Sequence, residues 1–198
     1  MDIKIIAEIG INHDGDADKA MALIKAASNS GVWGVKFQYR NLENAYADDA
    51  KQIGDEMLLT EIRRNYLSPE TILSLTGQAK QLGLAVGISF FDTQDMLDFA
   101  DELASFDFFK VPSVELSNIE LVNSMLRLDK PVYLSLGCHN EAEIDEAISQ
   151  FKGDNWLALH CVSNYPVSLT NARLGYLKHM ANKWQRPFGY SSHDNDWE

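Results

Sequence analysis

Seven short, continuously apolar runs recur along the 198-residue chain, and each leads through polar or glycine-containing residues into the next segment. A strand that is buried on both faces of a parallel sheet is apolar throughout rather than at alternate positions. The pattern therefore predicts an α/β protein, either an open doubly wound sheet or a (β/α)₈ barrel. The expected strands are Ile3–Ile9, Gly34–Phe37, Leu84–Ser89, Phe106–Pro112, Pro131–Leu136, Trp156–Val162 and Pro187–Ser191.

The segments between these runs have helical character. Asp18–Ser30 places alanine, leucine and isoleucine at the spacing of one helix face, and Asn140–Phe151 does the same. Ser68 followed by proline and glutamate is typical of a helix start, and we expect this helix to run to about Leu82. The stretch Asn41–Tyr66 is longer than an ordinary connection, which favours a functional loop.

Polar residues stand at the carboxyl end of nearly every expected strand. In a barrel these ends converge on one face and form one site, whereas in an open sheet they would spread along a line. No G-x-G-x-x-G or Walker loop supports a nucleotide-binding open sheet. The sequence thus predicts a TIM (β/α)₈-type barrel as a single domain over residues 1–198, with seven strands present and the eighth missing at the C-terminal end. The polar strand-end residues are Glu8, Lys36, Gln38, Ser89, Lys110, Ser113, Glu115, Ser135, His160, Ser191 and His193.

The charge balance narrows the class of partner. The chain has 29 acidic and 17 basic residues, a formal net charge of −12. Because nucleic acids and anionic membranes require basic surface, we expect neither as a partner. Cys138 and Cys161 cannot form a disulfide framework and have no metal-type spacing, so packing is their expected role. No signal peptide or bilayer-length apolar stretch is visible, and we expect a cytoplasmic protein.

Two lysines at strand ends point to an anionic ligand. A cation at the end of a buried strand needs an anion, because its desolvation is costly. Lys36 and Lys110 would repel each other unless a dianion such as phosphate lay between them. The alternative for Lys36 is a structural ion pair with Glu8. Hydroxyls that could complete a phosphate cradle are those of Ser89, Ser113, Ser135 and Ser191.

The histidines and internal carboxylates leave alternatives open. His160 and His193 each end a strand and are either structural residues or metal ligands. His13 lies in an Asn-His-Asp-Gly sequence that is also a good turn. Glu8 and Glu115 are placed for acid–base chemistry or for holding sugar hydroxyls.

Six motifs, taken in order, resemble the sialic acid (N-acetylneuraminate) synthase family, which includes related nonulosonate synthases and a spore-coat polysaccharide synthesis protein. The resemblance covers essentially the whole chain, and the motifs share compatible spacing. They are Ala7–Gly15, Val35–Gln38, Phe109–Asn118, Leu134–Gly137, His160–Pro166 and Ser191–His193.

The resemblance implies a transferase that condenses phosphoenolpyruvate (PEP) with an N-acetylated amino sugar, typically N-acetylmannosamine. It implies a divalent metal, manganese first and magnesium or cobalt as alternatives, with His193 as a ligand, and a homodimer. Glu115 would handle the proton, and Lys110 would act with it in catalysis. By position, the PEP-binding residues would be Lys36, Ser89, Lys110, Ser113, Ser135 and Ser191, and the sugar-binding residues Glu8, Gln38, Glu115 and Tyr165.

Several departures from the family pattern leave the sugar open. Phe90 replaces a proline, Leu136 stands where threonine is common, and Ser192 replaces an aspartate. The family's second metal histidine, on the eighth strand, and its C-terminal antifreeze-like domain are not found in this sequence. We therefore expect residues 1–198 either to self-associate or to be a portion of a longer polypeptide, and to show little or no synthase activity in isolation. Two alternatives stay open: a catalytically silent binding or assembly module, and another PEP or phospho-sugar aldolase-type barrel.

Overall fold

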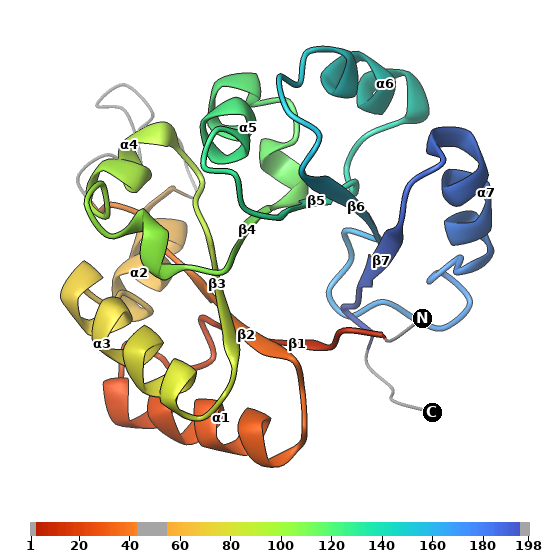
Figure 1. The fold of residues 1–198 in the computed structure, drawn as a ribbon. Coiled ribbons are helices and arrows are strands. Elements are labelled where there is room, and N and C mark those ends of the chain that lie inside the picture. The colour runs from red at the N-terminus through yellow and green to blue at the C-terminus, as the bar shows by residue number, and fades with distance from the viewer. Residues whose placement is uncertain (1–2, 43–54, 195–198) are drawn as a thin grey trace. The chain divides into compact units, whose positions relative to one another are not determined.

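The computed structural model describes residues 3–42 and 55–194, with side chains described from residue 60 onward in the second range. Strands and helices alternate along the chain, as the apolar runs predict (Figure 1). The chain divides into two compact units, with the boundary between Phe108 and Phe109. Each of the seven expected strands is present, and each differs from its expected range by no more than three residues at either end.

The first unit contains a parallel sheet in which β2 pairs with both β1 and β3. The register places Lys36 beside Glu8 on one neighbour and beside Gly87 on the other. Helices α1 and α3 lie side by side and pack against these strands (Figure 1). The elements are β1 (Ile6–Gly10), α1 (Ala17–Asn29), β2 (Gly34–Gln38), α2 (Asp55–Arg64), α3 (Pro69–Gln81), β3 (Ala85–Ser89), α4 (Thr93–Leu97) and η1 (Leu103–Ser105).

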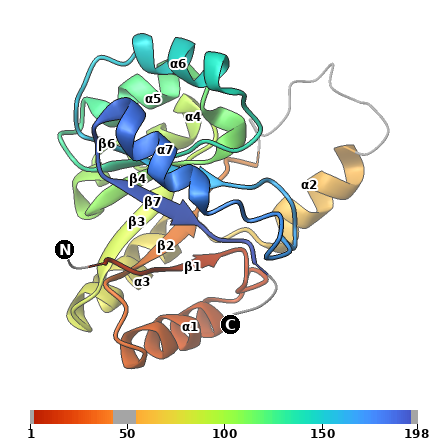
Figure 2. The same cartoon turned by 90° about the vertical axis from the view of Figure 1, so that its right-hand side faces the viewer.

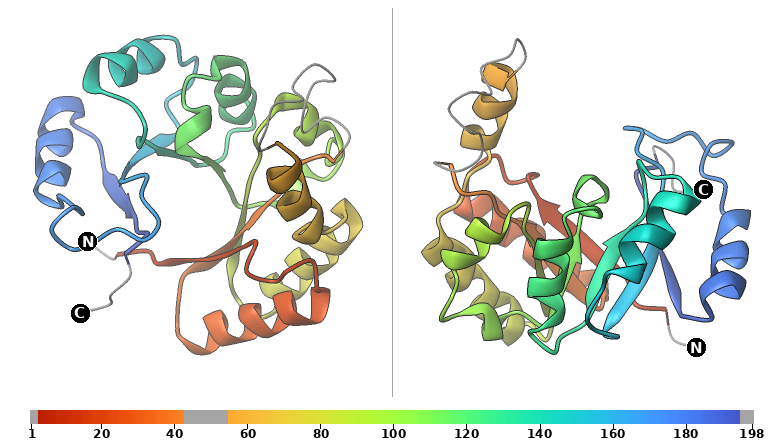
Figure 3. Two further views of the ribbon diagram at one scale, coloured as in Figure 1. Left: turned by 180° about the vertical axis from the view of Figure 1, so that it is seen from behind. Right: turned by 90° about the horizontal axis from the view of Figure 1, so that it is seen from above.

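The second unit repeats the strand-then-helix order with all of its strands parallel (Figure 3). Helix α7 runs alongside β7 (Figure 2). Its strand pairs place Ser135 beside Leu159 and Ser191 beside Cys161. The elements are β4 (Phe108–Val111), whose first residue belongs to the first unit, η2 (Ser113–Glu115), α5 (Ile119–Leu126), β5 (Val132–Ser135), α6 (Glu141–Ser149), β6 (Trp156–Cys161), α7 (Gly175–Trp184) and β7 (Phe188–Ser191).

Local sequence explains where the helices begin. The Ser68 hydroxyl accepts a hydrogen bond from the Thr71 amide, and Pro69 follows at the first helical position. Asn140 caps α6 and forms a reciprocal capping box with Glu143. Each cap satisfies a backbone amide that would otherwise lack a partner in the first helical turn. The starts of α1, α3 and α6, the helices expected from the sequence, therefore agree with the sequence signals to within a residue.

From its length, we expected the connection Asn41–Tyr66 to be a loop. The structure shows that part of it is helical. Helix α2 occupies Asp55–Arg64, a stretch of good helix formers that ends with Arg63 and Arg64 in its last turn. Residues 43–54, which hold most of the rest of this connection, lie outside the described part of the structure. Among the described residues, no helix is both long and apolar enough to cross a membrane.

Candidate functional site

In the first unit, Lys36 is the centre of a polar cluster at the strand ends. Its side chain is 7% exposed, and Nζ lies 2.6 Å from Oε2 of Glu8. Nζ also donates a 2.8 Å hydrogen bond to Oγ of Ser89, which is 1% exposed. Of the two roles considered for Lys36, the structure therefore shows the ion pair with Glu8. Ser89 is a second partner of the same ammonium group.

Glu8 and Gln38 converge on Gly10, the last residue of β1. Gly10 has a φ of +43°, a conformation that L side chains rarely adopt. A Cβ at this position would lie 2.7 Å from Oε1 of Glu8 and 3.0 Å from Nε2 of Gln38. The glycine thus leaves room for both side chains. The structure brings together Glu8, Lys36, Gln38 and Ser89, four of the residues singled out from the sequence.

In the second unit, Ser113 and Ser135 bury hydroxyls that need a partner. Among the described residues, neither Oγ atom makes a hydrogen bond of ordinary geometry. Such an orphaned hydroxyl is costly, and a ligand that supplies the missing bond removes the cost. A Cβ at Gly137 would lie 2.8 Å from Oγ of Ser113 and 2.3 Å from Oγ of Ser163. The absence of a side chain at Gly137 therefore keeps the space between these two hydroxyls open.

Cys161 lies beside His193, with 3.9 Å between Sγ and Nδ1. Burial alone would raise the pKa of the Cys161 thiol, but the His193 ring and the Ser113 hydroxyl outweigh it, and the pKa is lowered. The positive charge of Lys110 acts in the same direction. The pKa of His193 is raised, and the largest cause is its interaction with the Cys161 thiol. Lys110, Ser113, Cys161 and His193 thus influence one another electrostatically. Cys161 is buried, as its expected packing role requires, and it also contacts His193.

The surroundings of His193 fix its ring. Nδ1 lies 3.2 Å from the Val162 carbonyl, and the Tyr165 ring lies 4.1 Å away between centroids. A metal-binding imidazole commonly donates its other N–H to a carbonyl in this way, which would leave Nε2 for a metal ion. Within residues 3–42 and 55–194, however, no group of three or more His, Cys, Asp or Glu could hold one. The described residues therefore do not form a complete metal site.

Two further predicted residues have clear positions. Glu115 ends η2 and is half-buried, with Asn118 Nδ2 donating to its Oε2 at 3.3 Å. Ser191 ends β7 and is paired in register with Cys161. Ser191 therefore belongs to the strand ends of the second unit that also carry Cys161.

The other histidines have structural roles. His160 is buried, and its Nε2 forms a 2.8 Å hydrogen bond with the Ala172 carbonyl. This agrees with a structural role for His160 rather than a role as a metal ligand. His13 is 1% exposed and accepts a hydrogen bond from the Gly15 amide, which confirms the turn. His139 is half-buried and contacts both Ser117 and the Gly137 carbonyl.

Sequence reasoning missed Ser163 and the coupling of Cys161 to His193. The two coupled residues are 32 positions apart and meet only because β6 pairs with β7. The available signal was the position of Cys161 directly after a strand-end histidine.

Comparison with known proteins agrees with this architecture. A model of the NeuB family matches residues 23–198. N,N'-diacetyllegionaminic acid synthase of Campylobacter jejuni is 31% identical over 96% of this chain and 60% of its own length. Spore coat polysaccharide biosynthesis protein SpsE of Bacillus subtilis is 30% identical over 96% of this chain and 52% of its own length. The crystal structure of a sialic acid synthetase from Leptospira borgpetersenii superposes with a TM-score of 0.87 at 26% identity, over 98% of this chain and 66% of that one.

The fold is therefore that of the sialic acid synthase barrels, with seven parallel strands in this chain. The chain belongs to the NeuB family. It spans 60% or less of the length of the curated relatives named above.

Proposed function

We propose that this chain carries the PEP-binding and condensing residues of a nonulosonate synthase, an enzyme that joins PEP to an N-acetylated amino sugar. The observation that carries the proposal is the pair of buried hydroxyls of Ser113 and Ser135, neither of which makes a hydrogen bond of ordinary geometry to any described residue. Lys110 lies near enough to the same cluster to influence Cys161 electrostatically. Neutral donors beside a cation form a suitable cradle for a phosphate in a chain whose net charge is −12.

The remaining roles follow the family resemblance. Ser191 would complete the phosphate cradle in the second unit, and Lys36 and Ser89 would also bind PEP. Glu8, Gln38, Glu115 and Tyr165 would hold the sugar. The convergence of Glu8 and Gln38 over Gly10 supports a shared role for those two side chains.

The reaction joins C3 of PEP to the aldehyde carbon of the open-chain sugar. The aldehyde oxygen takes up a proton, water adds at C2 of the PEP unit, and phosphate leaves with its bridging oxygen. Glu115 is the proposed proton carrier, since a carboxylate at the site can take a proton from the water. Lys110 stabilises the charge on the departing phosphate. A divalent metal would supply Lewis-acid polarisation of the aldehyde.

For the metal, we propose Mn²⁺, with Mg²⁺ or Co²⁺ as substitutes, and His193 Nε2 as one ligand. The bond from Nδ1 to the Val162 carbonyl supports this assignment, because it fixes the ring with Nε2 unused. We also propose a homodimer that acts in the cytoplasm, without nucleic acid or membrane as a partner. The excess of 29 acidic over 17 basic residues supports the last point.

Phosphate release from PEP tests the proposal directly. The assay takes the longest available chain, Mn²⁺, and a panel of N-acetylated amino sugars. A synthase releases phosphate only when a suitable sugar is present, and the Lys110→Ala variant loses this release. Phosphate release that does not depend on any sugar would favour another aldolase-type reaction. No release and no PEP binding would favour a silent module.

A further inference from the structure

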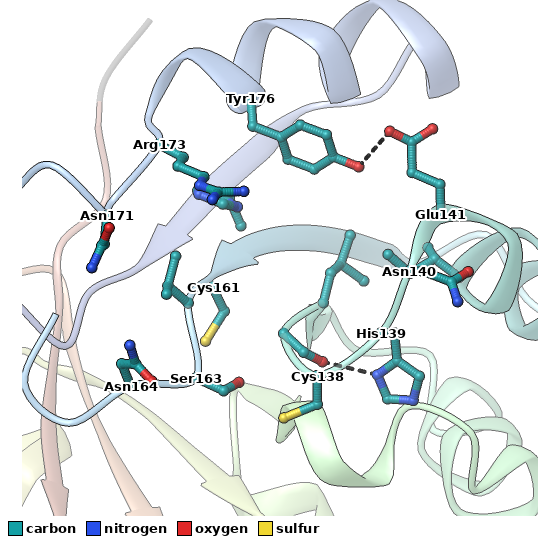
Figure 4. Close-up of a pocket in the computed structure, with 15 residues that line it drawn as sticks. Cys138, His139, Asn140, Glu141, Cys161, Ser163, Asn164, Asn171, Arg173 and Tyr176 are labelled. Atoms are coloured by element: carbon teal, nitrogen blue, oxygen red, sulfur yellow. Dashed lines mark hydrogen bonds between the residues drawn. The ribbon is translucent and has the colours of Figure 1, made fainter.

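A pocket lined by described residues lies wholly within the second unit. Its volume is about 590 Å³, and it opens between the chain segments that follow β5 and β6 and the beginnings of α6 and α7 (Figure 4). The pocket floor reaches Gly137 and Ser163, but most of the wall is made of residues for which the proposed condensation has no role. These residues include Asn164, Asn171, Arg173 and Tyr176.

Arg173 supplies a positive charge to this wall. In Figure 4 its side chain extends toward the interior of the pocket. Arg173 is exposed, and among the described residues nothing forms a hydrogen bond or an ion pair with its guanidinium group. Its φ of +48° is unusual for arginine, and such backbone conformations gather at functional sites. Helix α7 begins two residues later, at Gly175, and its N-cap residue Leu174 provides no side-chain cap, so the helix dipole adds to the positive potential near Arg173.

Two asparagine side chains complete this side of the pocket. Asn164 and Asn171 are exposed, and no residue in the described part of the chain forms a hydrogen bond with either side-chain amide. Each amide can donate and accept, so each can bind a hydroxyl. The ring of Tyr176 lies between Arg173 and Glu141 and adds an apolar surface to the pocket (Figure 4).

The backbone that carries these groups is held at two points. Nε2 of buried His160 bonds to the carbonyl of Ala172, the residue before Arg173. The amide of Val167 donates to the His193 carbonyl at 2.8 Å. Polar groups on a backbone fixed in this way are preorganised for a ligand.

The opposite wall is acidic and already paired. Glu141 accepts a hydrogen bond from Tyr176 at 2.8 Å and lies within 3.1 Å of both His179 and Lys183. Asp145 lies beyond it, 2.7 Å from the same lysine. An anionic group is therefore favoured at the Arg173 end of the pocket and disfavoured at the Glu141 end.

We propose that this pocket is a binding site for a sugar acid, a polyhydroxylated small molecule with one carboxylate. Arg173 binds the carboxylate through its planar guanidinium, and Asn164 and Asn171 bind hydroxyls. A carboxylate fits better than a phosphate, because one arginine is the only cation on the wall that is not already paired among the described residues, and a dianion would require more positive charge. The site does not depend on the proposed condensation.

Calorimetry with three matched probes tests the site: D-glucuronate, D-glucose and D-glucose 6-phosphate. Glucuronate should bind, and glucose should bind at least about tenfold more weakly, because it lacks the carboxylate. Arg173→Asn should weaken glucuronate binding by at least about tenfold, and Asn tolerates the positive φ. Arg173→Lys, which keeps the charge, should recover part of the affinity. Arg127→Asn, which removes an exposed charge outside the pocket, should have no effect.

Other outcomes would overturn the proposal. Failure of glucuronate to bind, or equal losses in Arg173→Asn and Arg127→Asn, would remove the site. Tighter binding of glucose 6-phosphate than of glucuronate would remove the carboxylate assignment. PEP affinity should be unchanged in Arg173→Asn. A parallel loss of PEP binding would show that the pocket belongs to the phosphate cradle, whereas failure of PEP to bind the unmodified chain would count against the proposed function alone.

Discussion

Nζ of Lys36 lies 2.6 Å from Oε2 of Glu8, and the two residues are opposite each other in the register of β1 and β2. The lysine is buried, and the side chain of Glu8 is 42% exposed. A ligand can therefore approach the pair from the Glu8 side. The pair also means that a ligand anion at Lys36 competes with a carboxylate that is already in place.

This relationship leads to a prediction about PEP binding. Lys36→Ala and Lys110→Ala should each weaken PEP binding by about 1.5–3 kcal/mol, the scale of a charge-assisted hydrogen bond. Glu8→Gln should bind PEP at least as tightly as the unmodified chain, because the competing charge is gone. Calorimetry measures all three variants, with Arg127→Asn as the control. Unchanged affinity in both lysine variants would end the assignment of Lys36 and Lys110.

Replacement of Glu115 separates binding from proton transfer. Glu115→Gln keeps the shape of the side chain and removes its basic oxygen. PEP affinity should stay the same, while turnover should fall by about 10²–10⁴-fold, the usual contribution of a general acid–base group. Phosphate release by the longest available chain measures turnover. Glu120→Gln, on the exposed first turn of α5, is the matched control. Full turnover of Glu115→Gln across the pH range would show that Glu115 only holds the sugar.

Replacement of two glycines of the first unit by alanine should change the free energy of unfolding in opposite directions. A Cβ at Gly87 would lie 2.1 Å from the Phe108 ring, so Gly87→Ala should destabilise the fold by about 1–3 kcal/mol. A Cβ at Gly77 in α3 meets nothing within 4 Å, and Gly77→Ala should stabilise the fold by up to about 1 kcal/mol. Urea unfolding of both variants checks the pair. A similar change in both would contradict the packing of Phe108 against Gly87.

Asp95 should make the stability of the first unit depend on pH. Its side chain accepts hydrogen bonds from the backbone amides of Asn41, Phe91 and Asp92, but burial dominates and raises its pKa. A raised pKa contributes stability below the pKa of the unfolded chain, and this contribution is lost as the pH rises through the folded-state pKa.

Asp95→Asn cannot titrate and loses one of the two acceptor oxygens. It should destabilise the fold by about 1–3 kcal/mol, and its deficit relative to the unmodified chain should be largest at low pH. Urea unfolding at a series of pH values gives the difference in unfolding free energy. A difference that is constant or that grows toward neutral pH would contradict the raised pKa.

The strands were predictable because burial on both faces leaves a continuous apolar run, as in Ala85–Ile88, where Val86, Gly87 and Ile88 are all buried. The caps at Ser68 and Asn140 were predictable because a cap depends on side chains within three residues. Helix α2 was missed because its apolar residues occur inside a polar stretch that reads as a connection. A length argument alone cannot reveal such a helix.

The site was predictable where one residue type at a strand end has few alternatives, as with Lys36. It was not predictable where a contact depends on strand pairing, as between Cys161 and His193. The wall that contains Asn164 and Arg173 follows no period at all, because loop residues obey neither the helical nor the strand repeat. The left-handed φ of Arg173 could not be read from a sequence in which glycine is the usual signal for that conformation.

The anchoring of the segment after β6 has a consequence for how this family could diversify. The segment is fastened at Val167 and at Ala172, both of which are buried, while residues 168–171 between them are exposed. Substitutions at these four positions can change the side chains at the rim of the pocket while the backbone hydrogen bonds at Val167 and Ala172 stay in place. Ligand preference and stability are then free to evolve separately, and a combinatorial library at residues 168–171 would explore new ligands in a scaffold that still folds.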